Sequence, residues 1–296
     1  MYLVTGATGQ LGCRIVRKLR EQNLPVRAFV RLSARYTELE ARGAQIFIGD
    51  LRHGADIRKA CQGVTAIIST HSASRAQSLD EIEAVDYRAN MALIDQAQVL
   101  GIEHFTFISV LGADRRYEDA PIFKAKAAVE HYLQASGVSF TILRPAGLAS
   151  NLLSVAEQFR RTGIYWLIGD PQNRTSIVST DDLAQIAATS HANPGAHQQV
   201  LAVGGPEILH RGDIPKLMGQ LFDREPWVLN LPLLAVDGVR NILGWVNPPA
   251  QSTLGTFRTL LAHEFFCTPE ETEQIQSLYD IPLESLEHFL KRYLSI

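Results

Sequence analysis

Three glycines near the start of the chain have the spacing that binding a phosphate group requires. Gly6, Gly9 and Gly12 follow a short apolar stretch and open a segment with apolar residues at fourfold spacing. Glycine permits a tight turn and a close approach of the backbone to a ligand. The helix that follows would present free N–H groups and its positive dipole end to a pyrophosphate. A glycine triplet between a strand and a helix predicts dinucleotide binding, here by Gly6, Thr8, Gly9, Gln10, Leu11 and Gly12.

The residue after the second predicted strand indicates which dinucleotide is bound. An NAD site usually has Asp or Glu about 20 residues after the glycines, where it accepts hydrogen bonds from the ribose hydroxyls. This chain has Arg31 at that point. A guanidinium matches a 2′-phosphate in charge and in geometry, so the sequence predicts NADP, with NAD less favoured. An ordinary surface arginine is the alternative interpretation.

Alternating strand and helix patterns predict the elements that position these residues. Such alternation is typical of a doubly wound parallel sheet, a Rossmann fold with helices on both faces. The carboxyl ends of its strands then form one edge, where the predicted cofactor-binding residue Thr70 and then His71 follow the fourth strand. His71 is a candidate proton donor there, with a polar loop residue as the alternative. The predicted strands are 2–5, 26–30, 45–48, 64–69, 104–109, 138–143 and 199–203, and the predicted helices are 10–20, 34–42, 54–62, 82–100 and 121–136.

The pattern changes after Pro206, and this change predicts two domains. Residues 1–205 form the dinucleotide-binding domain, with a cleft-forming insertion near 150–175, and residues 206–296 form a small, mostly helical lobe. Within that lobe, Thr268-Pro-Glu-Glu271 predicts a helix with a capping box. Residues 227–246 concentrate apolar side chains, but proline and charges interrupt them too often for a membrane span. They are expected to pack on the first domain, or to dock a membrane-protein complex.

Composition narrows the function classes. A net charge of −3 without a basic run gives no reason to expect nucleic-acid binding. The three cysteines are far apart in the sequence, which is typical of inert thiols in a reducing compartment. His263-Glu264 lacks the second histidine of a zinc motif, so no metal is predicted. These features favour a cytoplasmic or stromal protein without a transmembrane segment.

Several motifs in the chain resemble those of a known family. They include 5–12, Val30-Arg31, Gly49-Asp50-Leu51, Val85-Asp86-Tyr87, 105–109, 126–130, 141–147 and 178–184. With these motifs the chain resembles the extended and atypical short-chain dehydrogenase/reductases, specifically the NmrA-like branch. Its layout is most similar to a cyanobacterial and plastid subgroup that assists photosystem II assembly.

The resemblance implies roles for further residues. Asp50, with Leu51, would meet the adenine, and Pro145 and Gly147 would lie near the nicotinamide. Typical members use Ser, Tyr and Lys, with the tyrosine four residues before the lysine. Ser109 and Lys126 match the first and last of these, but Ile122 stands at the tyrosine position and has no proton to give.

The missing tyrosine leaves two functions open. The first is an NADP(H)-binding assembly factor or redox-responsive scaffold, peripheral at the thylakoid membrane through a partner. The second is an NADPH-dependent reductase of a small conjugated or quinone-like acceptor. Lys126 retains a role as a ribose-binding donor in both functions, and a surface pair with Glu130 is the alternative interpretation for that lysine.

Overall fold

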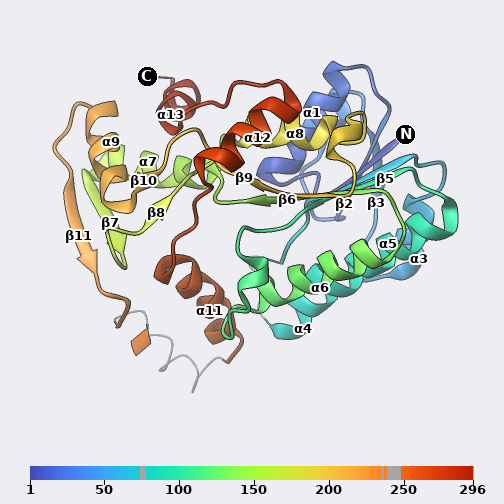
Figure 1. Ribbon diagram of the computed structural model, residues 1–296, viewed down its shortest axis with the longest axis horizontal. Helices are drawn as coiled ribbons and strands as arrows, with labels where there is room; N and C mark the ends of the chain where they lie inside the picture. The colour runs from blue at the N-terminus through green and yellow to red at the C-terminus, as the bar shows by residue number, and fades with distance from the viewer. Residues whose placement is uncertain (74–77, 235–236, 239–247, 296) are drawn as a thin grey trace.

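The computed structural model describes residues 1–73, 78–234, 237–238 and 248–295 (Figure 1). Its centre is a seven-stranded, fully parallel sheet with the order β3-β2-β1-β4-β5-β6-β9. The strands are β1 (Tyr2–Thr5), β2 (Val26–Val30), β3 (Gln45–Ile48), β4 (Ala66–Ser69), β5 (His104–Ile108), β6 (Phe140–Pro145) and β9 (Gln199–Val203). All seven predicted strands are therefore confirmed, and so is the doubly wound Rossmann fold.

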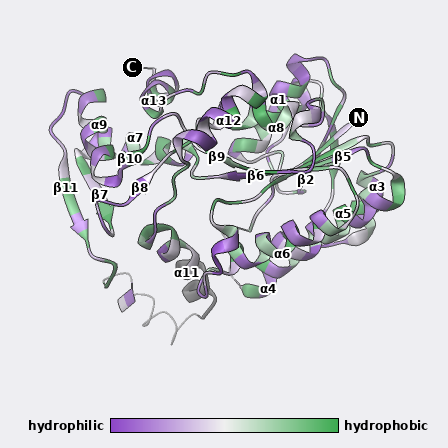
Figure 2. Cartoon of the chain, in the orientation of Figure 1, coloured by the Kyte–Doolittle hydropathy of each residue, from purple (hydrophilic) through white to green (hydrophobic). Residues whose placement is uncertain are grey.

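Helices cover both faces of this sheet (Figure 1). One layer contains α1 (Gln10–Glu21), α8 (Thr180–Thr189) and α12 (Pro269–Tyr279), and the other contains α3 (Gly54–Ala60), α5 (Ala89–Leu100) and α6 (Pro121–Ala135). Each layer shares one buried apolar cluster with the sheet face beneath it. Figure 2 shows hydrophilic and hydrophobic residues alternating along α5 and α6, as expected for helices with one solvated face. A short helix, α2 (Thr37–Ala41), packs beside β3.

The helix predicted over 82–100 is interrupted by a wider turn. It begins as α4 (Leu79–Ile82), continues as the π-helical segment η1 (Glu83–Arg88), and becomes α5 at Ala89. Ser78 caps its start by accepting a hydrogen bond from the Glu81 N–H. A π-helical turn adds one residue to the turn and often occurs at functional sites, and here it contains the buried Asp86.

A third apolar cluster builds a lobe beside the sheet. Its helices are α7 (Leu153–Thr162), α9 (Ile214–Leu221) and α13 (Leu286–Leu294). Two short sheets complete it: β7 (Ile164–Ile168) pairs parallel with β11 (Trp227–Leu231), and β8 (Arg174–Thr175) pairs antiparallel with β10 (Leu209–His210). The lobe thus combines the predicted insertion with C-terminal residues. Its four strands were not predicted, and β11 lies where helical structure was expected.

Two helices near the C-terminus, one on the sheet and one in the lobe, can be compared with the sequence pattern. Thr268 and Glu271 form the predicted capping box of α12. Helix α13 has one apolar face, with Leu286, Phe289 and Leu290 buried in the third cluster. Helix α11 (Pro248–Ala262) lies between this lobe and α6 (Figure 1).

An ionic cluster around Asp181 joins α13 to the first helix of the chain. Asp181, at the start of α8, lies 2.5 Å from the Arg17 guanidinium and 2.8 Å from that of Arg292. The Tyr293 hydroxyl donates to the same carboxylate at 2.7 Å and accepts from Arg14 Nε at 3.1 Å. Helices from the beginning and the end of the sequence are therefore held together by one buried aspartate.

A candidate dinucleotide-binding site

The glycine loop between β1 and α1 has no room for side chains at two of its three glycines. Gly6 has a φ of +70°, and a Cβ there would lie 2.7 Å from the backbone nitrogen of His71. A Cβ on Gly12 would lie 2.2 Å from the Gly6 carbonyl oxygen. A Cβ on Gly9 would meet only that oxygen, at 3.2 Å, so the space beyond Gly9 is open. The loop is thus compact on its inner side and accessible at the start of α1.

The start of α1 presents backbone donors rather than a capping side chain. Gly9 is the N-cap residue, with extended backbone and no side-chain hydrogen bond. Thr8, Gly9 and Gln10 are exposed, whereas Leu11 is buried in the core. Leu11 therefore offers only its backbone N–H to a ligand. Free N–H groups at a helix start favour an anion such as a pyrophosphate.

The other predicted cofactor residues line the same edge of the sheet. Because all strands are parallel, their carboxyl ends meet at one edge. Each of these residues lies at or just beyond the end of a strand: Arg31 after β2, Asp50 and Leu51 after β3, Thr70 after β4, and Pro145 and Gly147 at and after β6. The fold brings them to one edge, and contact with a nucleotide remains a prediction.

Arg31 and Asp50 differ in their surroundings: the first is exposed, and the second already accepts hydrogen bonds from another residue. The Arg31 side chain is exposed, so its guanidinium is accessible to a phosphate. Both Asp50 carboxylate oxygens accept hydrogen bonds from Arg52, the shortest of them 2.5 Å long, and this interaction lowers the pKa of Asp50. An adenine that bonds to Asp50 would share it with Arg52.

His71 is part of a buried network and is fully hydrogen-bonded. Its Nε2 lies 3.0 Å from the Val85 carbonyl oxygen, and its Nδ1 lies 2.8 Å from Thr5 Oγ1. A carbonyl can only accept, so Nε2 carries the hydrogen and Nδ1 accepts from the threonine. Burial, together with the charge of Lys126, lowers the pKa of His71 to about 3, so the ring is neutral. This geometry favours a structural role over the predicted proton donor.

Lys126 is buried at the carboxyl end of β5. Its ammonium donates to the Ile108 carbonyl oxygen at 2.7 Å and lies 5.1 Å from the centre of the Phe107 ring. Burial lowers the pKa of Lys126, while the carboxylates of Asp86 and Glu130 oppose that shift. The alternative of an exposed pair with Glu130 is wrong, because both side chains are buried and Glu130 instead binds Arg144.

Asp86 is a neighbour of Lys126 that the sequence analysis did not select. Its Oδ2 accepts from the Ala73 N–H at 2.8 Å, and its Oδ1 is buried without a hydrogen-bond partner among the described residues. Burial raises the pKa of Asp86, and Lys126 opposes this. The Val85-Asp86-Tyr87 motif was a signal for this residue, but only the fold brings it near enough for its charge to act on Lys126.

In the fold, the predicted catalytic serine is buried, and the residue at the tyrosine position packs in an apolar cluster. Ser109 follows β5 and is buried, and its hydroxyl has no hydrogen-bond partner among the described residues. Ile122 packs against Ala73 and Ile82 in a small apolar cluster. Tyr117, the nearest tyrosine before Lys126 in sequence, packs its ring against Phe123, Phe265 and His263 instead. The described site therefore has a lysine and a serine but no tyrosine at the expected position.

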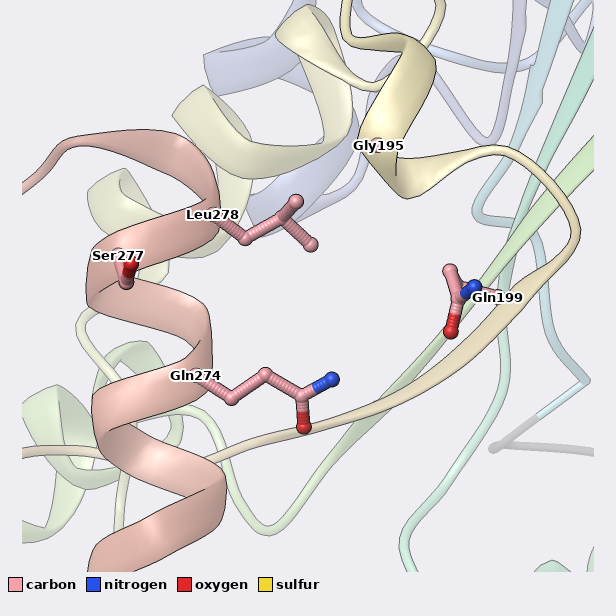
Figure 3. A pocket seen from close by; sticks show the side chains of 5 residues that line it. All are labelled: Gly195, Gln199, Gln274, Ser277 and Leu278. Carbon is pink, nitrogen blue, oxygen red and sulfur yellow. The ribbon is translucent and has the colours of Figure 1, made fainter.

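Two hollows lie outside the glycine loop. One, of about 340 Å³, is lined by Leu51, Arg52, Ile57 and Arg88, among others, and so lies next to the predicted adenine residues. The other, of about 330 Å³, lies between α12 and β9 (Figure 3), where Gln274 and Leu278 face Gln199. Gln199 begins β9, so this second hollow lies at the amino ends of the strands, opposite the dinucleotide edge.

The fold and the glycine loop agree with a comparison of the sequence with known families. The profile of the NAD(P)H-binding family matches residues 6–194. The chain belongs to this family. Within it, the NmrA-like character expected from the motifs is confirmed.

Two curated relatives cover most of the chain. The photosystem II assembly factor Ycf39 of Cyanophora paradoxa is 27% identical over 300 residues, which cover 99% of this chain and 92% of the relative. The NAD(P)H azoreductase of Xenophilus azovorans is 32% identical over 217 residues, covering 72% of this chain and 71% of the relative. One relative is thus named for assembly and the other for reduction.

A solved structure supports the fold of this NAD(P)H-binding protein. The NADPH-dependent quinone oxidoreductase QOR2 of Escherichia coli, solved with NADPH, superposes with a TM-score of 0.75. The match covers 99% of this chain and 100% of the other, at 20% identity. At that identity the likeness establishes the shared Rossmann architecture.

Three further features bear on the sequence predictions. In the part of the chain that the structure describes, no group of three or more His, Cys, Asp or Glu side chains is placed to hold a metal ion. Among those same residues, no helix has both the length and the apolar character to cross a membrane. Burial raises the pKa of the Cys61 and Cys267 thiols to about 12, which makes them poor nucleophiles.

Proposed function

We propose that the protein is an NADP(H)-binding assembly factor or redox-responsive scaffold that acts at photosystem II. The observation that carries this proposal is a complete glycine loop and a buried Lys126 combined with Ile122 at the tyrosine position. Such a site can hold a dinucleotide but lacks the usual proton donor for turnover. The similarity to Ycf39 along nearly the whole chain supports the same conclusion.

We expect NADPH to bind more tightly than NADH. Arg31 replaces the acidic residue of NAD sites, and its exposed guanidinium can bind the 2′-phosphate. Arg31→Ala should weaken NADPH binding by about 1.5–3 kcal/mol, the scale of a charge-assisted hydrogen bond, and leave NADH binding nearly unchanged. Titration calorimetry with both nucleotides tests this. Equal affinity of the parent protein for NADPH and NADH would contradict the NADP assignment.

An apolar face on β7 and β11 supports a docking role. Tyr165 and Leu167 point into the third cluster, so the alternate residues of β7 face away from it. The parallel register places Trp227 beside Ile164 and Leu229 beside Trp166 on that outward face. Trp166 is 49% exposed and Trp227 is 66% exposed. Exposed aromatic clusters of this kind often mark protein interfaces.

Only part of the predicted docking segment 227–246 can be described. Residues 227–234 and 237–238 lie within the described ranges, whereas 235–236 and 239–246 lie outside them. We propose that the described face contributes to binding a membrane-protein complex, which would hold the protein peripherally at the thylakoid membrane on its cytoplasmic or stromal side.

Replacing Trp227 by aspartate is expected to release this partner. A charge at the centre of an apolar contact carries a desolvation cost that the partner does not compensate. NADPH affinity should stay unchanged, because β11 belongs to the lobe and not to the nucleotide edge. Native gels of membrane extracts, probed for the protein, measure the bound fraction. Val99→Asp is the matched control, since Val99 is 77% exposed on α5. Loss of the complex in both variants, or in neither, would count against this face.

Reduction of a conjugated acceptor is the second function that specific observations favour. Lys126 is retained, and two relatives are named for azo and quinone reduction. Hydride transfer to a conjugated acceptor produces a stabilised anion, which needs less help from a general acid than a simple alkoxide does. We therefore propose NADPH-dependent reduction of a quinone-like compound as the alternative activity.

A panel of acceptors separates the two functions. Simple aldehydes and ketones should not be reduced at a useful rate, because general acid catalysis usually supplies about 10²–10⁴-fold and Ile122 cannot provide it. Loss of NADPH absorbance is followed with quinones, azo dyes, enones and simple carbonyls. Turnover confined to quinones or azo dyes would favour the reductase. No turnover with any acceptor, together with tight NADPH binding, would favour the scaffold.

A further inference from the structure

We propose that Asp86 is a proton-binding residue that couples its protonation to the oxidation state of the bound nicotinamide. This inference rests on the proposed binding of NADP(H) and adds a means of regulation at the same site. Its starting point is the unpartnered Oδ1 of Asp86, a buried carboxylate oxygen in the π-helical segment η1. A buried charge normally has partners on all sides, so this oxygen indicates a carboxyl group that can take up a proton.

The groups around Asp86 leave Lys126 as its main electrostatic partner. From the segment after β4, the Ala73 N–H donates to Asp86, Ser72 lowers the pKa of Asp86, and His71 is neutral. From α5, Asn90 donates its amide to the Asp86 backbone carbonyl rather than to the carboxylate. From α6, Lys126 is the charged group that lowers the pKa of Asp86, against the larger effect of burial.

The remaining charges nearby are engaged elsewhere. Glu130 acts on Lys126 but accepts two hydrogen bonds from the Arg144 guanidinium. Glu83 and Arg88, on the same π-helical segment, lie on the exposed side and face one another at 3.7 Å. Among the described residues, Asp86 and Lys126 are thus two buried titratable groups whose charges act on one another.

One short segment connects Asp86 to the glycine loop. The backbone of His71 packs so closely on Gly6 that a Cβ there would lie 2.7 Å from the His71 nitrogen. Two residues later, Ala73 donates to Asp86. Residues 71–73 thus link Asp86 to the backbone that packs on Gly6, and Asp86 is buried, in surroundings of low dielectric where a charge acts strongly.

The two forms of the cofactor differ by one positive charge at the nicotinamide ring. The oxidised ring is a cation and favours the Asp86 carboxylate, whereas the reduced ring is neutral and favours the protonated acid. Binding of NADP⁺ to the protonated protein then gives the carboxylate complex and releases one proton to the buffer. Binding of NADPH leaves that proton on Asp86. The ratio of the two affinities should change with pH, by up to tenfold per pH unit.

Proton release during binding tests this directly. Titration calorimetry of NADP⁺ and NADPH in buffers of different ionisation enthalpy, from pH 6 to 8.5, counts the protons released. The 2′-phosphate is common to both nucleotides, so its contribution cancels in the difference. We expect NADP⁺ to release up to one proton more than NADPH in part of this range, with a matching three- to tenfold change in the affinity ratio per pH unit. If NADP⁺ and NADPH release the same number of protons at every pH in this range, that result on the parent protein is enough to overturn the inference.

Amino-acid substitutions show which residue carries the proton that NADP⁺ binding releases. Asp86→Asn keeps an oxygen for the Ala73 N–H but cannot titrate, so the difference between the nucleotides should disappear. Asp182→Asn is the control: burial raises the pKa of Asp182 to about 6, but this carboxylate accepts from the Glu284 N–H and belongs to α8, in the helix layer on the other face of the sheet from α5 and α6. That variant should keep the difference. If Asp86→Asn does not fold, Lys126→Met serves instead and should move the pH range upward.

The outcomes separate this inference from the proposed function. Asp86→Asn with an unchanged pH-dependent difference would overturn the role of Asp86 while leaving NADP(H) binding intact. Failure of both nucleotides to bind at every pH would contradict the proposed function itself, and this inference with it.

Discussion

Arg144→Met is expected to destabilise the protein by about 3–5 kcal/mol, the usual effect of removing one partner from a buried ion pair. Arg144 extends from β6 and binds both oxygens of Glu130 on α6, at 3.0 and 2.5 Å. The Glu130 side chain is only 3% exposed, so it would be left charged and without its partner. Denaturant unfolding at pH 7, followed by circular dichroism, measures the change.

A double variant shows how much of this effect comes from the stranded charge. Glu130→Leu together with Arg144→Met removes both charges and should restore most of the lost stability, because apolar replacements of buried pairs are often close to neutral. Asp114 also pairs with Arg144 but is largely exposed, so it contributes little. If the double variant is as unstable as Arg144→Met, the loss reflects packing rather than an unpaired carboxylate.

Gly12→Ala is the second change with a large expected effect. In a helix interior, alanine is normally favoured over glycine by about 1 kcal/mol. Here its Cβ would lie 2.2 Å from the Gly6 carbonyl oxygen and 2.8 Å from the Ala7 Cα, both of them backbone atoms that cannot rotate away. The steric clash outweighs the higher helix propensity of alanine, so we expect the free energy of unfolding to fall by about 2–3 kcal/mol. Tight NADPH binding should be lost as well. Thermal unfolding and titration calorimetry measure the two effects.

Gly9→Ala separates folding from binding in the same loop. Its Cβ would meet only the Gly6 carbonyl oxygen, at 3.2 Å, and Gly9 has a φ of −77°, which any residue can adopt. Stability should change little, whereas the added methyl group would occupy the space at the start of α1 and weaken NADPH binding. A Gly9→Ala protein that binds NADPH as tightly as the parent would argue against a phosphate at this position.

The parallel sheet was predictable because its signals are local. Runs such as 26–30 and 104–108 are short and apolar, and glycine follows several of the intervening helices. The strands of the lobe lack such signals. Strand β7 finds its partner β11 about 60 residues later, and both are short edge strands next to helices. Pairing over that distance is decided by the third apolar cluster rather than by the sequence around either strand.

The site was predictable in its residues but not in their partners. Lys126 and Glu130 have the spacing of a surface pair on one helix, yet α6 packs this face against the sheet. Lys126 consequently donates to a strand carbonyl, and Glu130 binds an arginine of β6. The role of His71 was equally hidden, since its tautomer depends on Thr5 and Val85 and its neutral state depends on burial and on Lys126. Asp86 became a candidate only once the fold showed it buried in the π-helical turn, where the charge of Lys126 acts on it.

The cluster around Asp181 has a consequence for how the protein is made. Arg14 and Tyr293 are 279 positions apart in the sequence, yet they hydrogen-bond to one another beside the same aspartate. During synthesis on the ribosome, α1 emerges early and must wait for α13 before this cluster can close. The contacts of Tyr293 and Arg292 with Asp181 can therefore form only after α13 has left the exit tunnel, so a stalled or shortened chain would lack this link between α13 and α1.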